Sequence, residues 1–224
     1  MARHRIRFQK EGRGIYLSHL DLMRTMQRAF QRAGLRLRHT EGFNPHPYIS
    51  VALPLSLGVE SQVELLDFEL LPPDDVLLPT LPERLTGKLP LGITVLEAYR
   101  ADKKAKDIVW LGLSAVLEYD RALDTADMTQ RLGDFFSQKN LSVKKLTKKK
   151  EETKLDIAPL IRNIRFTPQG TREIALEAVV AAQNPSLNPA LLIETLRQKS
   201  AQLAPDFTFF SRRELYDKEM QIFR

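Results

Sequence analysis

The chain contains no cysteine. This absence excludes disulfides, thiolate zinc sites, cysteine-ligated iron–sulfur clusters and cysteine nucleophiles, so a metal site would need histidine and carboxylate ligands. No apolar run approaches the roughly 18 residues that a membrane-spanning helix needs, and we expect no membrane association. The first ten residues, MARHRIRFQK, have no apolar stretch after their basic side chains, so we expect no signal peptide and a cytoplasmic location. Gly-rich phosphate loops, GxSxG elbows and RNP-type aromatic motifs are missing too.

Composition is that of an ordinary globular protein, but the charge is unevenly distributed. The 224 residues are 43% hydrophobic and 28% charged, with a net charge of +6. Residues 1–60 carry ten Lys or Arg against four Asp or Glu, and residues 103–150 carry eleven against six. Residues 61–102 carry three against eight. A basic surface can simply keep a protein soluble, but clustered positive charge also attracts polyanions and favours a nucleic-acid partner.

The first half of the chain predicts six elements. Residues 3–9 alternate as a strand does. Ser18, with Asp21 three residues later, predicts the start of a helix, and Gly34 predicts its end. Strands are expected at 48–55, 62–71 and 93–100, with a short helix near 77–86.

The second half repeats this order of elements. Strands are expected at 109–119, 172–181 and 207–216, with strand candidates at 141–148 and 163–166 and helices at 125–139 and 188–203. The sequence therefore predicts an α+β protein of two tandem ferredoxin-like (β-α-β-β-α-β) domains, residues 1–102 and 107–224. The polar, charged segment 101–107 is the expected boundary.

Arginines repeat along the first predicted helix. Arg24, Arg28 and Arg32 are four residues apart and therefore share one face, opposite Met26 and Phe30. Like charges at this spacing repel, and no acid follows Asp21 on the helix to relieve them. Such a row is typical of a surface that meets an anion, although acids from residues 64–75 could instead neutralise it. Arg36 and Arg38 extend the basic patch into the next segment.

The segment after this helix, TEGFNPHP at residues 40–47, predicts a stiff loop. Gly42 permits a positive φ, while Pro45 and Pro47 restrict both themselves and the residues before them. Phe43, Asn44 and His46 could therefore be held ready to stack on and bond to a base or another small ligand. The alternatives are that Phe43 fills a core and that the prolines only shape a crossover. We expect this loop beside the N-terminal half of the helix, sharing one pocket with His19.

Other polar groups carry weaker hypotheses. His19, His39 and His46 match no compact metal motif, so we expect no metal, although Asp21 or Glu41 could complete a site. His19 or His46 could act as a general acid or base on RNA, because histidine titrates near neutral pH. The basic run Lys144, Lys145 and 148–150 is either a solvated hairpin tip or a phosphate clamp.

Three segments together resemble a known family. They are RFQKEGRGIYLSHLDLMRTMQRAFQRAGL at 7–35, TEGFNPHP at 40–47 and LPLSLGVES at 53–61, with DIAPLI at 156–161 as a weaker match. They resemble the radical-SAM-associated (radical-SAM-linked) protein family, whose members are fused to a radical SAM domain or encoded beside one. The resemblance implies an RNA-modification setting and assigns no catalytic residues. Without cysteine, this chain would be the accessory part. The tandem element order also looks like RAMP-type endoribonucleases, an analogy of fold alone.

Three functions stay open at this point. The first is a non-catalytic, RNA-binding accessory protein that presents RNA, such as tRNA or rRNA, to a radical SAM enzyme and needs no cofactor of its own. The second is a metal-independent RAMP-like ribonuclease using His19 or His46. The third is a protein-docking module for the radical SAM partner. The predicted nucleic-acid-binding residues are Arg24, Arg28, Arg32, Arg36, Arg38, Phe43, Asn44 and His46.

Overall fold

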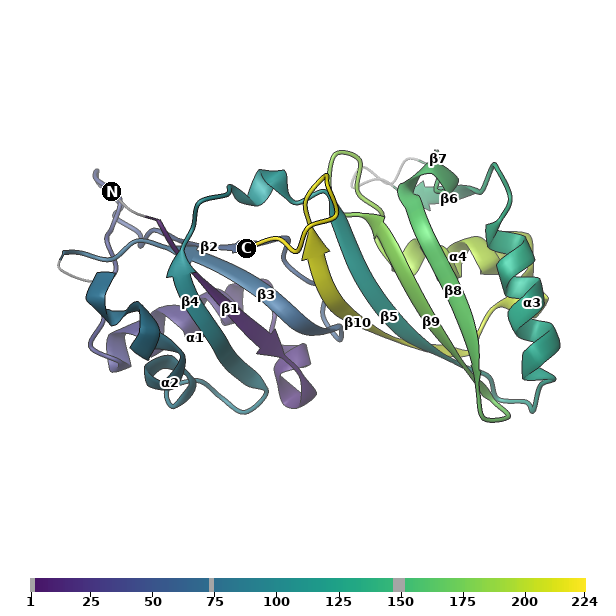
Figure 1. Ribbon diagram of the computed structural model, residues 1–224, viewed down its shortest axis with the longest axis horizontal. Coiled ribbons are helices and arrows are strands. Elements are labelled where there is room, and N and C mark those ends of the chain that lie inside the picture. Colours follow the sequence, from purple (N-terminus) through teal and green to yellow (C-terminus); the bar gives the residue numbers. More distant parts are fainter. Residues whose placement is uncertain (1–2, 73–74, 147–151) are drawn as a thin grey trace. The chain divides into compact units, whose positions relative to one another are not determined.

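The chain divides into two compact units. The computed structural model describes residues 3–72, 75–146 and 152–224, and these form four α-helices and ten strands (Figure 1). The first unit is residues 1–107 together with Arg224, and the second is residues 108–223. Each contains both helices and strands, so the protein is a mixed α and β structure. Among the described residues, no helix is both long enough and apolar enough to cross a membrane.

The first unit is a four-stranded antiparallel arrangement with two helices. In chain order it contains β1 (His4–Lys10), η1 (Gly12–Tyr16), α1 (His19–Arg32), β2 (Ile49–Ala52), β3 (Glu60–Phe68), η2 (Asp75–Thr80), α2 (Leu81–Thr86), β4 (Ile93–Arg100) and η3 (Ala105–Asp107). The strands lie in the order β4-β1-β3-β2, and every neighbouring pair is antiparallel. Successive side chains of a strand point to opposite faces, so one face of this sheet meets the helices and the other does not.

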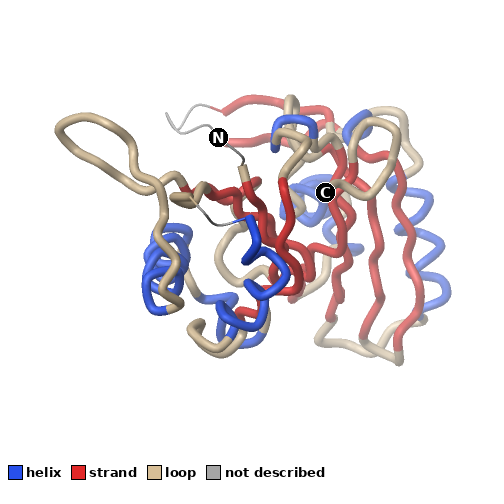
Figure 2. The backbone as a smooth tube through the Cα atoms, turned by 60° about the vertical axis from the view of Figure 1, so that its left-hand side comes forward, coloured by secondary structure: helices blue, strands red, loops and turns tan. Residues whose placement is uncertain are grey.

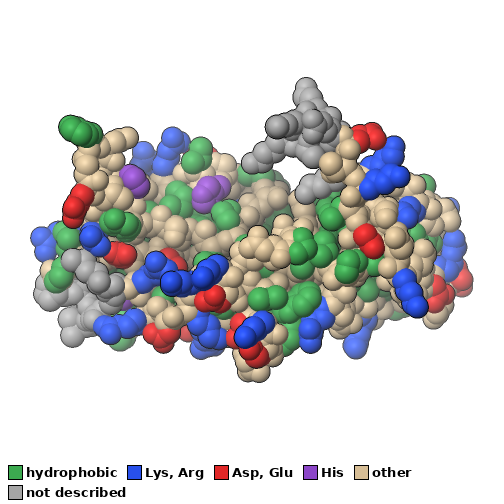
Figure 3. All heavy atoms as spheres, turned by 90° about the horizontal axis from the view of Figure 1, so that it is seen from above, with side chains coloured by type: hydrophobic (Ala, Val, Ile, Leu, Met, Phe, Trp, Pro, Cys, Tyr) green, Lys and Arg blue, Asp and Glu red, His purple; other side chains and the backbone are tan. Residues whose placement is uncertain are grey.

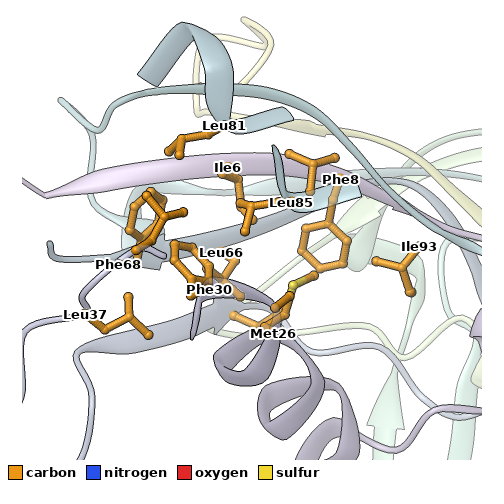
Figure 4. Close-up of a cluster of buried hydrophobic side chains, with 14 of the residues drawn as sticks. Ile6, Phe8, Met26, Phe30, Leu37, Leu66, Phe68, Leu81, Leu85 and Ile93 are labelled. Atoms are coloured by element: carbon orange, nitrogen blue, oxygen red, sulfur yellow. The ribbon is translucent and has the colours of Figure 1, made fainter. Parts of the chain in front are cut away.

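The core of the first unit lies between the sheet and its helices. Met26 and Phe30 of α1 and Leu81 of α2 are fully buried against Ile6 of β1 (Figure 4). The Phe30 ring lies 4.8 Å from that of Phe68, centroid to centroid, and tilted to it. Helix α1 therefore turns its apolar side to the sheet, which leaves its arginines on the opposite side.

Local sequence explains where α1 begins and ends. Ser18 caps the helix, because its Oγ accepts a hydrogen bond from the Asp21 backbone N–H at 3.2 Å. Gly34 follows the helix with φ of +69°, a conformation that favours glycine, and turns the chain away. Arg84 of α2 donates to the Ala33 carbonyl at 2.5 Å and so satisfies one free carbonyl at that end. The predicted start and stop of this helix are both confirmed.

The second unit contains the remaining elements. They are β5 (Trp110–Glu118), α3 (Thr125–Phe136), β6 (Ser142–Leu146), β7 (Glu152–Asp156), η4 (Ala158–Leu160), β8 (Ile161–Gln169), β9 (Glu173–Ala181), α4 (Ala190–Lys199), η5 (Ala201–Leu203) and β10 (Phe207–Tyr216). Strands β10-β5-β9-β8 follow one another with antiparallel pairing. Helix α3 buries Phe136 against Phe166 of β8, with ring centroids 5.6 Å apart.

Two predicted elements of this unit differ from the structure. The strand candidates at 141–148 and 163–166 are both strands, β6 and part of β8, but β6 pairs with β7 in a separate ribbon and only β8 joins the main sheet. The helix expected at 188–203 is α4 followed by the short turn η5, because the chain changes helical form at Ser200. The lysines at 148–150 lie outside the described residues.

Candidate nucleic-acid interface

Three arginines form a row along the exposed side of α1. Arg24, Arg28 and Arg32, hereafter the arginine row, are all exposed, whereas Met26 and Phe30 on the opposite side are fully buried. Because α1 rises about 1.5 Å per residue, the row spans roughly 12 Å. On the face that Figure 3 shows, other basic side chains (blue) and two histidine patches (purple) also lie on the first unit.

Few acids neutralise this row. Arg24 lies 3.6 Å from Asp21, with both side chains mostly exposed, and Arg28 forms no ion pair or hydrogen bond with any described residue. Arg32 donates to the Lys88 backbone carbonyl, which anchors its side chain without removing its charge. Exposed ion pairs such as Arg24–Asp21 contribute little, so the row keeps most of its positive charge.

Acids in residues 64–69 serve other arginines instead. Asp67 binds the buried Arg5, and Glu69 accepts from Arg38 with Nη1 and Oε2 2.9 Å apart. Arg36 is exposed, and its backbone carbonyl accepts from the Leu71 N–H at 3.0 Å. The five predicted arginines therefore differ: four stand in solvent, while Arg38 is partly buried in an ion pair.

Residues 37–48 form a hairpin beyond the C-terminal end of α1. Its arms are joined by hydrogen bonds from the Thr40 N–H to the His46 carbonyl and from the Tyr48 N–H to the Arg38 carbonyl, both 2.8 Å. The Arg38 N–H in turn donates to the Glu69 carbonyl at 2.8 Å. The hairpin therefore extends the sheet edge just after β3, and a tan loop stands clear of the first unit in Figure 2.

The tip of this hairpin is presented to solvent. Phe43 is fully exposed, which excludes it from the core, and Asn44 and His46 are exposed beside it. Gly42 has φ of +122°, a conformation that favours glycine. Thr40 Oγ1 accepts from the His46 N–H at 3.1 Å and lies 3.2 Å from His46 Nδ1. An exposed aromatic ring on a turn that is held by hydrogen bonds is suited to contact another molecule.

The predicted position of the loop relative to His19 is wrong. His46 lines a hollow at the foot of the hairpin, whereas His19 lines a different pocket with Leu17 and Pro54. The reason is the direction of α1: the hairpin follows its C-terminal end, and a helix of 14 residues is about 21 Å long. The free N–H groups at the N-terminus of α1 therefore lie too far from this hollow to bind a ligand in it.

The hollow at the foot of the hairpin has a volume of about 310 Å³. Tyr48, Ser50 and Glu69 line it together with Thr40 and His46, and the Arg38 guanidinium lies 4.9 Å from the centre of the Tyr48 ring. Sequence reasoning missed Tyr48, Ser50 and Glu69. The alternation of 62–71 places Glu69 on the same face of the sheet as Asp67, but no pattern in the sequence brings Tyr48 and Ser50 to that face.

Other groups contribute less to this interface. Lys144 forms an exposed ion pair with Glu152 at 3.2 Å on the β6–β7 ribbon. No three histidine or carboxylate side chains of the described residues are grouped so that they could hold a metal ion. In the second unit, burial raises the pKa of Tyr119 to about 12, and its hydroxyl donates to the Leu203 carbonyl at 3.0 Å.

Comparisons with known proteins identify the family of the chain but no relative of known function. No curated protein matches the chain. One solved structure, described as "Crystal structure of putative glycine cleavage system transcriptional repressor", aligns over 94% of this chain and 98% of its own. Its sequence identity is 10% and its TM-score 0.27, so it carries no argument about fold or function. A family model described as "Uncharacterized protein conserved in bacteria (DUF2344)" matches residues 3–189, and the chain belongs to that family.

Proposed function

We propose that the protein binds RNA as an accessory protein and presents it to a radical SAM modification enzyme. The observation that carries the RNA part is the arginine row, which is exposed, roughly 12 Å long by helix geometry and largely unneutralised. Phosphates attract such a row through charge, and the released counterions make binding depend steeply on salt. The radical SAM part rests on the sequence resemblance, and the absence of cysteine leaves this chain the accessory role.

The hairpin of residues 37–48 gives this proposal its second contact. It follows the C-terminal end of α1, so the arginine row leads toward it along the helix. Phe43 at its tip can stack on a base, and Asn44 and His46 can bond to base edges. Arg36 is exposed between the row and the tip, where it can meet a phosphate, whereas Arg38 is paired with Glu69.

We also propose that each unit is a ferredoxin-like domain. The strand orders β4-β1-β3-β2 and β10-β5-β9-β8, all antiparallel, support this, as does one helix after the first strand and one before the last in each unit. In the second unit the β6–β7 ribbon is then an insertion between α3 and β8.

The ribonuclease alternative has less support. His19 and His46 line different pockets, so they do not form an acid–base pair, and each would have to act alone. A cleavage assay in EDTA with the purified protein tests this alternative. The docking alternative would place an acidic protein surface on the same arginines.

Charge reversal of the arginine row tests the proposed function. The variant Arg24→Glu, Arg28→Glu, Arg32→Glu should lose binding to single-stranded RNA in fluorescence anisotropy, while its melting temperature stays close to that of the wild type. The matched control reverses three exposed arginines of the second unit, Arg121, Arg131 and Arg172. Equal loss in both variants, or an affinity that does not depend on salt, would refute the arginine row as the RNA site.

A further inference from the structure

The hollow at the foot of the hairpin combines one aromatic ring with groups that can form hydrogen bonds. Tyr48 is 38% exposed, and the Arg38 guanidinium lies over its ring at 4.9 Å. Thr40, Ser50 and Glu69 contribute oxygen atoms, and Arg3 is exposed at the same hollow. An aromatic platform with polar groups at its edge is how proteins hold a flat, unpaired ring.

The charges around this hollow largely cancel. Glu69 Oε2 accepts from Arg38 at 2.9 Å, and both carboxylate oxygens of Asp67 accept from Arg5, at 2.5 and 3.0 Å. A bare phosphate would therefore meet two carboxylates that already have cations, and nothing favours it there. A neutral ligand with a π face and polar edges suits the hollow better. Arg3, at the rim of the hollow, can then meet a phosphate attached to that ligand.

The second carboxylate oxygen of Glu69, Oε1, can discriminate between nucleobases. Glu69 Oε1 accepts no hydrogen bond from the described residues, and neither Ser50 Oγ nor the Tyr48 hydroxyl forms one with them. An ionised carboxylate accepts hydrogen bonds and donates none. It therefore pairs with an exocyclic amino group, as a carboxylate does with N4 of cytosine, and it repels the carbonyl oxygen of uracil at the equivalent position.

We propose that this hollow binds one unpaired nucleobase with an exocyclic amino group, stacked on Tyr48 and read by Glu69. The inference rests on the proposed RNA-binding function and adds the conformation and the class of base that the protein selects. The base enters from a single-stranded segment whose phosphates lie along the arginine row. A base inside a duplex cannot reach Tyr48, because its faces are stacked and its pairing edge is occupied.

Free mononucleotides test the hollow without the arginine row. In heteronuclear NMR titrations of the full chain, CMP and AMP should shift the backbone amide signals of Tyr48 and Ser50, and UMP should shift them much less. Tyr48→Ala should weaken CMP binding by about fivefold or more, because a stacked base depends on its aromatic partner. The control is Tyr16→Ala, which removes another exposed tyrosine of the same unit that does not line the hollow.

A second variant separates recognition from folding. Glu69→Gln keeps the shape of the side chain but adds an N–H₂ donor, which uracil O4 can accept. The variant should bind UMP more tightly than the wild type does, and the ratio of CMP to UMP affinity should fall by about tenfold. A purely structural role of Glu69 would weaken all nucleotides alike. An unchanged CMP-to-UMP ratio would overturn recognition by Glu69.

The two proposals fail in different ways. If RNA binds through the arginine row but no mononucleotide moves the Tyr48 and Ser50 signals, the hollow is not a base site and the proposed function stands. If CMP binds at the hollow and the charge-reversed arginine row still binds RNA, the base site stands and the proposed phosphate contacts are wrong. An RNA with one abasic position in its single-stranded segment should bind less tightly than the intact RNA, and equal affinity would also overturn the base site.

Discussion

Loss of the Asp67 charge should destabilise the first unit strongly. Arg5 is fully buried, and its Nε and Nη2 bind the two carboxylate oxygens of Asp67 at 2.5 and 3.0 Å. Such a bidentate pair offsets much of the cost of taking a guanidinium out of water. In Asp67→Asn the side chain keeps its shape but loses its charge, so the buried Arg5 loses the compensating charge of that carboxylate.

The size of this effect follows from the burial of the pair. Breaking a buried ion pair by removing one partner costs about 3–5 kcal/mol. We expect the lower end, about 3 kcal/mol, because the substituted amide keeps one acceptor oxygen and because Arg5 Nη2 also donates to the Lys103 carbonyl at 3.0 Å. For a unit of this size that loss lowers the melting temperature by roughly 12 °C or more.

Urea unfolding followed by far-UV circular dichroism measures this loss. The control is Glu152→Gln, which breaks the exposed Lys144–Glu152 pair and should cost less than about 1 kcal/mol. Replacing both buried partners, Arg5→Met with Asp67→Leu, should recover much of the stability, since neither side chain of the pair then leaves the other's charge buried. If Asp67→Asn loses no more stability than the control, the burial argument is wrong.

Three further outcomes are expected. Replacing the arginine row by glutamine should reduce the slope of log K against log salt by about 2, since each of three lost phosphate contacts contributes roughly 0.7 for a single strand; an unchanged slope in anisotropy titrations would remove the row from the interface. Phe43→Ala should weaken RNA binding while the melting temperature stays constant, because the ring makes no core contact; a lowered melting temperature would assign it a structural role. The raised pKa of Tyr119 stabilises the folded protein below pH 10, where the tyrosine is neutral in both states, and this contribution is lost as pH rises from 10 to about 12. Unfolding of Tyr119→Phe should show less of this alkaline loss, and the same loss as wild type would assign it to other groups.

Local patterns were sufficient to predict most helices and strands. Ser18 and Gly34 mark the ends of α1 because capping and positive φ depend on a few neighbouring residues. The exposed arginine row followed from helical spacing alone. By contrast, the strand candidate at 141–148 pairs with β7 in a separate ribbon and not with the main sheet, and alternation within a strand does not encode which partner it pairs with.

The candidate site was only partly predictable for the same reason. The loop residues were recognisable from Gly42 and the prolines. The position of the loop was not, because it depends on the direction of α1, whose C-terminal end the loop follows. Tyr48 and Glu69 are 21 positions apart in the sequence and meet only because the hairpin pairs with the segment after β3. Sequence spacing carries no sign of such a meeting, so the hollow between them was not predicted.

The exposed hairpin tip also makes the protein convenient to label. Since the chain has no cysteine, Glu41→Cys would create the sole thiol, and a thiol-reactive dye would attach there alone. Glu41 is exposed and lies just beyond Thr40, whose bonds to His46 close the turn, so the dye would stand in solvent near Phe43. Its fluorescence would then report directly on whatever approaches the tip, in real time and with the remainder of the chain unchanged.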